Sequence, residues 1–179
     1  PETGFTGFDN FTYLDNQGIE QTVRIEVGHS GNARSIQIDV TGQTHPQLDS
    51  RLAALSNGDT VVVWREYSSV YSIFYQRFSP EGIALTDKTK VYASTHQYEP
   101  AVAATADGGF VVSWQQSGNV YAKLFDADNT GGGLITVSAT TGTQDDSVVI
   151  LLANNDFVIA WDDTGANQFK ATIYSPAGE

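Results

Sequence analysis

The stretch that decides the fold is VAATADGGFVVSW at residues 102–114. It recurs as LAALSNGDTVVVW at residues 52–64 and as VILLANNDFVIAW at residues 149–161. The Trp residues that close these stretches recur about every 47 to 50 positions, which is near the length of one β-propeller blade. Each copy places Asn-Gly, Asp-Gly or Asn-Asn between two apolar runs, and such pairs favour the positive φ of a hairpin turn. The repeat therefore predicts two antiparallel strands in each copy.

Each copy continues in the same way after its Trp. A short polar turn leads to IFYQRFSPEG at 73–82, VYAKLFDADN at 120–129 and FKATIYSPAG at 169–178. Further apolar segments near residues 90–92 and 134–137 predict a fourth strand in the first two copies, whereas the third copy stops without one. No window sustains a 3.6-residue period, so little helix is expected.

The fold predicted from this pattern is all-β, with tandem four-stranded antiparallel units in a small or partial β-propeller. A β-sandwich is the alternative, because three clear units need not close a ring. Repeats are predicted at 45–95, 96–140 and 141–179, together forming one compact domain with residues 1–44. Residues 22–27 and 35–40 alternate between polar and apolar side chains, which predicts a capping hairpin or a degenerate first unit.

Composition narrows the classes of partner. The 179 residues carry a formal net charge of −12, which repels phosphate backbones and anionic membranes. We therefore expect neither nucleic-acid binding nor membrane insertion. The sequence has no Cys, which excludes disulfides, thiol nucleophiles and Cys-ligated zinc.

The run that begins at Pro100 and continues through AVAAT, ADGG, FVVSW and VYAKLFDADN resembles repeats of large bacterial RTX-type adhesins. The resemblance covers residues 45–179, and the RTX nonapeptide itself is absent. It implies an extracellular, cell-surface module that is assisted by calcium. The partners it implies are a glycan or peptide on another cell or surface, and other domains of the same long chain.

The three Trp residues are predicted to belong to the core rather than to a sugar-stacking surface. Each shares a strand face with apolar residues, and the opposite face of each strand is also apolar or small. Strands of that kind are expected to be covered by a sheet on both sides.

Ligand-binding candidates follow each Trp, where the side chains differ from copy to copy. Strand ends and loops on a rigid β scaffold often carry function, although a solvated rim with no ligand is the alternative. The candidates are Arg65, Glu66, Tyr67, Tyr71, Gln115, Gln116, Tyr121, Asp162 and Asp163.

Asp126 and Asp128 are the metal-site candidates, and Ca²⁺ is the expected ion. Residues 126–131 partly match the D-x-[DN]-x-[DN]-G calcium loop, but position twelve is Val137 instead of Glu. Asp residues are also common in hairpin turns without any metal.

No motif of a known catalytic class occurs, so the chain is predicted not to be an enzyme. Glu66, Glu99 and Asp162 could pair as glycosidase carboxylates, but sequence alone does not bring them together. The predicted function is a ligand-binding or adhesion module of a surface protein. The alternatives are a structural spacer without a ligand and a fragment of a polysaccharide-active enzyme.

Overall fold

The computed structural model describes residues 7–14, 20–27 and 34–39 by their backbone, and residues 45–94, 96–139 and 142–179 in full. The chain divides into two compact units, residues 1–44 and 45–179. The role of residues 1–44 and the inclusion of the whole chain in one compact domain stay predictions. No helix occurs among the described residues, and hence none that is long and apolar enough to cross a membrane.

The first unit contains one antiparallel sheet of three strands in the order β1 (Gly7–Leu14), β2 (Glu20–Val27) and β3 (Arg34–Asp39). The alternating segments of the sequence form β2 and β3, with Val23 opposite Ile38. The turn that the predicted hairpin requires between these two segments lies outside the described residues. The strand β1, which no pattern had indicated, pairs along β2.

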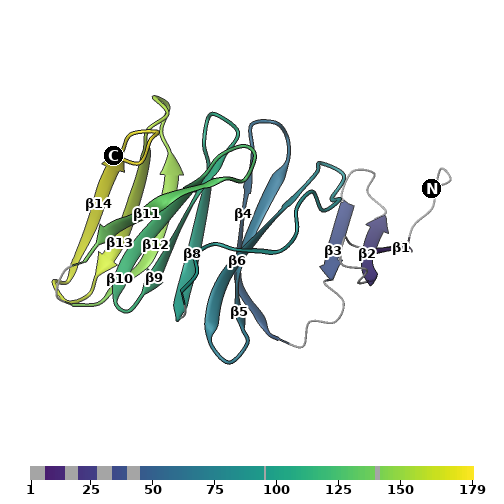
Figure 1. Ribbon diagram of the computed structural model, residues 1–179, viewed down its shortest axis with the longest axis horizontal. Helices are drawn as coiled ribbons and strands as arrows, with labels where there is room; N and C mark the ends of the chain where they lie inside the picture. The colour runs from purple at the N-terminus through teal and green to yellow at the C-terminus, as the bar shows by residue number, and fades with distance from the viewer. Residues whose placement is uncertain (1–6, 15–19, 28–33, 40–44, 95, 140–141) are drawn as a thin grey trace. The chain divides into compact units, whose positions relative to one another are not determined.

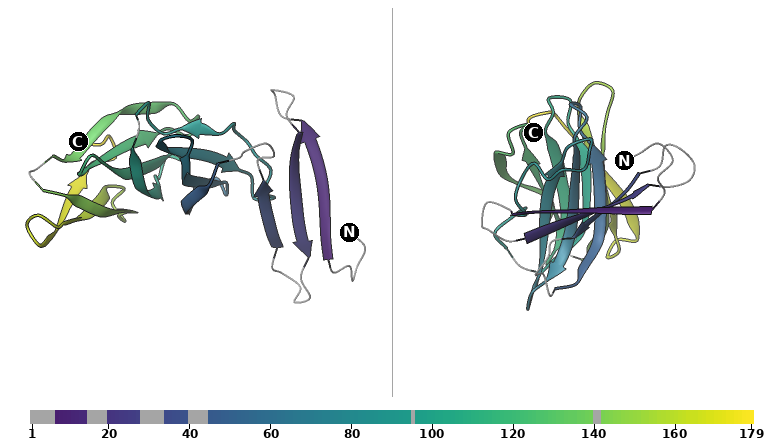
Figure 2. Two further views of the ribbon diagram at one scale, coloured as in Figure 1. Left: turned by 90° about the horizontal axis from the view of Figure 1, so that it is seen from below. Right: turned by 90° about the vertical axis from the view of Figure 1, so that its right-hand side faces the viewer.

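The second unit consists of three antiparallel sheets that follow one another in chain order (Figures 1 and 2). Sheet 1 is β4 (Gln47–Ala54), β5 (Thr60–Tyr67), β6 (Tyr71–Phe78) and β7 (Thr89–Lys90). Sheet 2 is β8 (Gln97–Ala104), β9 (Phe110–Gln116), β10 (Asn119–Phe125) and β11 (Gly131–Ser138). Sheet 3 is β12 (Gln144–Leu151), β13 (Phe157–Asp163) and β14 (Gln168–Tyr174). This all-β arrangement of successive small sheets is a partial β-propeller, as the repeat predicted.

The hairpin turns of the three copies have the chemistry expected of them. Gly58, Gly108 and Asn155 take φ of 91°, 89° and 70° in the turns between the first and second strands. In sheet 1 the Leu55 amide donates to the Asp59 carbonyl at 2.8 Å, and the other two copies repeat this bond. Glycine and asparagine reach this left-handed region at low cost, so each turn is set by its local sequence.

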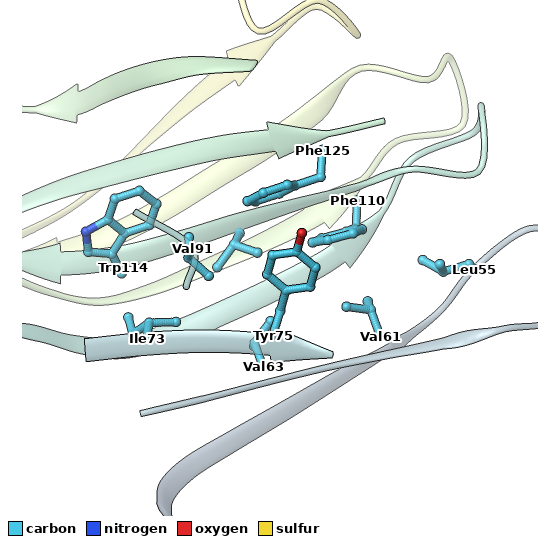
Figure 3. Packing of buried hydrophobic residues seen from close by; sticks show 10 residues of the cluster. Leu55, Val61, Val63, Ile73, Tyr75, Val91, Phe110, Trp114 and Phe125 are labelled. Carbon is cyan, nitrogen blue, oxygen red and sulfur yellow. The ribbon is translucent and has the colours of Figure 1, made fainter. Parts of the chain in front are cut away.

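The front face of each sheet is defined here as the face that carries its Trp, and the back face is the opposite one. The front of sheet 2 packs against the back of sheet 1. Tyr75 of sheet 1 points toward Phe110 and Phe125, with ring centroids 5.2 and 4.8 Å away (Figure 3). Phe110 and Phe125 stack on one another with centroids 4.8 Å apart. Aromatic pairs in such geometries add to the free energy gained by burying their area.

The back of sheet 2 packs in the same way against the front of sheet 3. Val111 and Ala122 meet Phe157, Ile159 and Trp161 in a second apolar core. The prediction that the Trp residues are core is confirmed, since Trp64, Trp114 and Trp161 are 6%, 0% and 6% exposed. Within residues 45–179, sheet 2 is packed against another sheet on both faces, as predicted for these strands, whereas sheets 1 and 3 are each packed against a sheet of this unit on one face.

Candidate functional site

The first strand of each sheet carries the same irregularity. The pairing of β4, β8 and β12 with the neighbouring strand shifts register at a bulge. The acidic residues Asp49, Glu99 and Asp146 stand there, at equivalent positions before the three Trp residues, with φ of 54°, 51° and 49°. Left-handed φ is uncommon for such residues, and bulges of this kind often re-aim a side chain beside a functional site. The repeat thus presents a carboxylate at the same place in each sheet.

These first strands are neighbours in space. β8 lies against β4 on one side and against β12 on the other. The Glu99 carboxylate, from sheet 2, accepts a hydrogen bond of 3.1 Å from the Asp146 amide of sheet 3. The bulges of sheets 2 and 3 are therefore joined directly.

Arg65 of sheet 1 reaches the bulge of sheet 2. Its guanidinium forms an ion pair of 2.8 Å with Asp49, which belongs to the bulge of the same sheet. The guanidinium also lies over the ring of Tyr71 at 4.5 Å and over that of Tyr98, from sheet 2, at 5.3 Å. Its Nε is buried and has no hydrogen-bond partner among the described residues. One donor of a half-buried cation is therefore left for another acceptor.

Three tyrosine rings follow one another beside Arg65. The centroids of Tyr67 and Tyr71 are 4.9 Å apart, and those of Tyr71 and Tyr98 are 5.2 Å apart. Tyr67 is 42% exposed, and the other two are half-buried. The rings form a partly exposed aromatic surface with hydroxyl groups that can donate and accept.

The electrostatics around Glu99 show that the acidic groups act on one another. Burial raises the pKa of the Glu99 carboxyl above its usual value. The hydrogen bond from Asp146 lowers this pKa, the carboxylates of Asp145 and Asp146 raise it, and the Arg65 guanidinium lowers it. Residues of all three sheets are thus coupled at one place. We name this set the Arg65 cluster: Asp49, Arg65, Tyr67, Tyr71, Tyr98, Glu99, Asp145 and Asp146.

Three of the ligand-binding candidates named from the sequence belong to this cluster, namely Arg65, Tyr67 and Tyr71, and so does Glu99, which was named as a possible glycosidase carboxylate. Gln115 and Asp162 occupy the positions equivalent to Arg65, directly opposite Tyr98 and Asp145 in the strand pairing. Both are half-buried, and the Gln115 Oε1 atom is buried without a partner among the described residues. The residue that follows each Trp therefore borders the cluster in sheets 2 and 3 and belongs to it in sheet 1.

The second residue after each Trp, by contrast, holds the scaffold together. Glu66 is 3% exposed and pairs with Lys88 at 3.1 Å on the face of β5 opposite Arg65. Asp163 is 2% exposed and pairs with Lys170 at 2.6 Å.

Gln116 and Tyr121 play similar supporting parts in sheet 2. Gln116 accepts from the Trp114 indole N–H at 3.3 Å and donates to Ser94 at 2.6 Å. Tyr121 stacks on Trp114, with ring centroids 6.2 Å apart. Four of the predicted ligand-binding residues therefore make contacts within the protein instead, namely Glu66, Asp163, Gln116 and Tyr121.

The calcium candidates lie in a turn. Asp128 accepts the Thr130 amide at 2.9 Å, and this hydrogen bond lowers the pKa of its carboxyl. Within the described ranges there is no group of three or more His, Cys, Asp or Glu side chains that could hold a metal ion. A calcium site at Asp126 and Asp128 stays a prediction.

Asp49 and Tyr98 were missed from the sequence. Asp49 could have been found by aligning the three copies backward from Trp, since Glu99 and Asp146 then fall beside it. Glu99 was named as a carboxylate partner of Glu66, but the two make different contacts. Glu66 pairs with Lys88 of sheet 1, whereas Glu99 accepts a hydrogen bond from the Asp146 amide of sheet 3. No sequence signal marks Tyr98, because its role depends on the packing of sheet 2 against sheet 1.

No family model matches the chain, and no curated protein matches it in sequence. Solved structures do match in fold. A protein of unknown function from Dyadobacter fermentans has a TM-score of 0.61 at 13% identity, over 90% of this chain and 51% of the other. An alpha-L-arabinanase from Penicillium chrysogenum, complexed with arabinobiose, has a TM-score of 0.58 at 13% identity, over 97% and 59%.

A third match is the alpha-L-arabinofuranosidase arb93a from Fusarium graminearum, with a TM-score of 0.54 at 13% identity, over 96% of this chain and 59% of the other. The chain thus spans between half and three fifths of the length of these three proteins. At such identities the likeness concerns the fold alone.

The comparisons correct one prediction. The chain was predicted not to be an enzyme because no familiar catalytic motif occurs. That inference is wrong, since two of the solved structures with this arrangement of sheets are an arabinanase and an arabinofuranosidase. Carboxylates that come from different strands leave no compact motif in a sequence, so the absence of a motif does not argue against catalysis. The chain has the fold of a β-propeller segment that is also found in glycoside hydrolases.

Proposed function

We propose that this chain is part of a carbohydrate-active β-propeller protein and that the Arg65 cluster binds a neutral oligosaccharide. The single observation that carries the proposal is the meeting of Arg65, three tyrosine rings and the bulge carboxylates of three sheets at one place. Sugars present apolar C–H faces and a rim of hydroxyl groups. Tyrosine rings suit the faces, and guanidinium and carboxylate groups suit the hydroxyls.

The charge of the cluster favours a neutral ligand over an anionic one. The guanidinium of Arg65 is already paired with Asp49, so its charge is largely compensated. Glu99, Asp145 and Asp146 leave the surroundings acidic, and the chain as a whole carries −12. An anionic sugar would be repelled, whereas a neutral sugar can use the same carboxylates as hydrogen-bond acceptors.

Calorimetric titration with arabinobiose, xylobiose and a neutral glucose disaccharide tests this proposal. Arabinobiose is the first probe because the Penicillium arabinanase structure contains it. Tyr71→Ala is expected to weaken binding about tenfold, which is about 1.4 kcal/mol. Tyr71→Phe keeps the ring and is expected to lose less affinity than Tyr71→Ala. Phe169→Ala removes an 88% exposed ring outside the cluster and is expected to leave the affinity unchanged.

Binding of none of these sugars by the unmodified chain would contradict the proposal. So would an equal loss of affinity in Tyr71→Ala and Phe169→Ala, because the cluster would then have no special part in binding.

A specific observation also favours glycoside hydrolysis at this place. Hydrolysis of a glycosidic bond needs a protonated carboxyl as acid and a second carboxylate as base or nucleophile. Burial and the neighbouring carboxylates raise the pKa of Glu99, which keeps a proton on it to higher pH. Asp145 and Asp146 are the carboxylates coupled to it.

The hydrolysis proposal is tested by release of reducing ends from neutral oligosaccharides. Glu99→Gln is expected to lower kcat by at least about a hundredfold with little change in KM, because the amide keeps the shape but cannot transfer the proton. If Glu99→Gln hydrolyses as fast as the unmodified chain, Glu99 is not the acid. Adhesion, calcium and an extracellular location stay predictions of the sequence.

A further inference from the structure

Asp49 is held against Arg65 by the bulge of β4. The pairing jumps from Leu48 to Arg51 on β4 while β5 advances by two residues, so β4 contains one extra residue here. Within this bulge Asp49 takes a φ of 54°, and its carboxylate forms the ion pair of 2.8 Å with the Arg65 guanidinium. Because a bulge re-aims the side chains beside it, the local backbone of β4 places this carboxylate on the guanidinium.

The ion pair is partly shielded from water. The Arg65 side chain is 17% exposed and that of Asp49 is 36% exposed. The rings of Tyr71 and Tyr98 lie against the guanidinium and restrict its position. Water and salt screen a pair in such surroundings less than a fully exposed one. Asp49 therefore compensates much of the positive charge of Arg65.

Arg65 is the cationic member of the Arg65 cluster, and its counterparts in sheets 2 and 3 are Gln115 and Asp162. The carboxylate of an acidic sugar would therefore find its natural partner in this guanidinium, which binds carboxylates through parallel N–H bonds. Asp49 already accepts from the Nη2 atom of Arg65. It also places a negative charge beside any second carboxylate that approaches, and like charges at such short range repel strongly.

The other carboxylates of the cluster act mainly on one another. Glu99 accepts the hydrogen bond of 3.1 Å from the Asp146 amide of sheet 3. Arg65 lowers the pKa of the Glu99 carboxyl, but this effect is smaller than the opposite effect of Asp145. Among the described residues, Asp49 is the carboxylate that forms an ion pair with Arg65. Asp49 is thus the group that controls whether the guanidinium can bind a further carboxylate.

We propose that Asp49 is a specificity-determining residue, which restricts the Arg65 cluster to neutral sugars by occupying the cation that an acidic sugar needs. This inference rests on the proposed function, because it requires that the cluster binds sugars. A neutral sugar needs only hydrogen-bond partners and ring faces, which the tyrosines provide. A sugar carboxylate needs an unpaired guanidinium, which the site offers only when the carboxylate of Asp49 is removed.

The experiment uses Asp49→Asn and two matched disaccharides. Asparagine has nearly the size of aspartate and tolerates a left-handed φ, so the substitution removes chiefly the charge. The probes are cellobiose and cellobiouronic acid, in which one hydroxymethyl group of cellobiose is oxidised to a carboxylate. Calorimetric titration gives the ratio of the two affinities. The unmodified chain is expected to prefer cellobiose by at least about tenfold, and Asp49→Asn is expected to shift this ratio toward the acid by at least about tenfold.

A charge-matched control separates this effect from a change in net charge. Asp128→Asn also removes one carboxylate, from an exposed turn of sheet 2. This turn follows Phe125, which pairs with the start of β9, whereas Tyr98 pairs near the end of β9. Asp128→Asn is therefore expected to leave the ratio of affinities unchanged.

Two further measurements identify Arg65 as the group that binds the acid. Combining Arg65→Gln with Asp49→Asn should abolish the gained preference, because no guanidinium remains. Raising sodium chloride from about 0.05 M to about 0.5 M should weaken the binding of cellobiouronic acid by Asp49→Asn far more than the binding of cellobiose. Asp49→Gly provides a second variant, since glycine also reaches the left-handed region, and circular dichroism shows whether each variant is folded.

The outcomes distinguish a failure of this inference from a failure of the proposed function. If the unmodified chain binds neutral sugars but neither Asp49 variant shifts toward cellobiouronic acid, the inference is overturned and the sugar site stands. An unmodified chain that binds cellobiouronic acid as tightly as cellobiose also overturns the inference. If the unmodified chain binds neither arabinobiose nor any other neutral sugar, the proposed function fails, and the inference fails with it.

Discussion

Sheet 2 and sheet 3 are built from the same repeated sequence, yet they end in different surroundings. Sheet 2 is covered on both faces, with Trp114 and Val111 fully buried on opposite sides of β9. Sheet 3 is covered only on its front, where Ile159 is fully buried, and its back leaves Ile150 56% exposed. Strand patterning is alike in the two sheets, so a strand's burial depends on which neighbours pack against it.

The contrast between the two sheets should be greatest for the aromatic residues. Trp114→Ala is expected to destabilise the protein by roughly 3–5 kcal/mol, because it empties a fully buried site between sheets 1 and 2. Phe169→Ala, on the uncovered back of sheet 3, is expected to change stability by no more than about 0.5 kcal/mol. Urea unfolding measures both. Equal losses would show that the two faces are not different in burial.

The two faces of sheet 3 can be compared within one sheet. Ile159→Ala on the covered front is expected to cost about 2–5 kcal/mol. Ile150→Ala on the uncovered back is expected to cost about 0.5 kcal/mol or less. Thermal unfolding of both variants decides the point. A loss at Ile150 as large as that at Ile159 would mean that the back face is covered within the chain.

A smaller effect is expected at Gly109, where sheet 2 differs from its neighbours. A Cβ at this residue would lie 2.1 Å from the Phe125 carbonyl oxygen, so the backbone would have to move. Sheets 1 and 3 carry Asp59 and Asp156 at the same position. Gly109→Ala is expected to cost roughly 1–3 kcal/mol, as overpacking usually does. Chemical denaturation of this variant beside Ala106→Gly, in the same turn, provides the measurement and its control.

The smallest effect concerns pH and the boundary between sheets 2 and 3. The folded-state pKa of Glu99 is raised, chiefly by burial, so its protonation contributes stability that is complete below the usual glutamate pKa of 4.5 and is lost as pH rises through the folded-state pKa. Glu99→Gln should remove this loss and make the variant relatively more stable at neutral pH. Asp107 has a lowered pKa because of the Thr105 hydroxyl, so its contribution is present above 3.8 and is lost as pH falls.

Melting temperatures measured from about pH 3 to about pH 8, a range that includes the usual carboxyl pKa values, test whether these two pH dependences have the predicted directions. Asp107→Asn is the matched control, and it should lose stability at neutral pH. If Glu99→Gln also loses stability at neutral pH, the raised pKa of Glu99 is not the governing feature.

Much of the fold could be predicted because it depends on local signals. Gly58, Gly108 and Asn155 mark the hairpins, and the alternation around each Trp marks the strands. The three strands of sheet 3 were also predicted, since the third copy contains the counterparts of β8, β9 and β10 of sheet 2. These features can be predicted without knowing which sheet packs against which.

The candidate site was only half predictable because it depends on contacts between sheets. Arg65, Tyr67 and Tyr71 were found because they are variable residues that follow a Trp. Glu66 lies at the same end of the strand, but its ion pair with Lys88 makes it part of the scaffold. Adjacent residues on a strand point to opposite faces, and the sequence does not say which face meets a neighbouring bulge. Tyr98 and Glu99 reach the cluster only because β8 packs between β4 and β12.

The central claim, that the Arg65 cluster is a sugar site, is tested most directly by following tyrosine ring signals by nuclear magnetic resonance during titration with arabinobiose. The rings of Tyr67, Tyr71 and Tyr98 are expected to shift together and to show saturation transfer with the sugar. The buried rings of Tyr75 and Tyr174 are expected to stay unchanged. Shifts confined to other residues, or no change with any neutral oligosaccharide, would contradict the account.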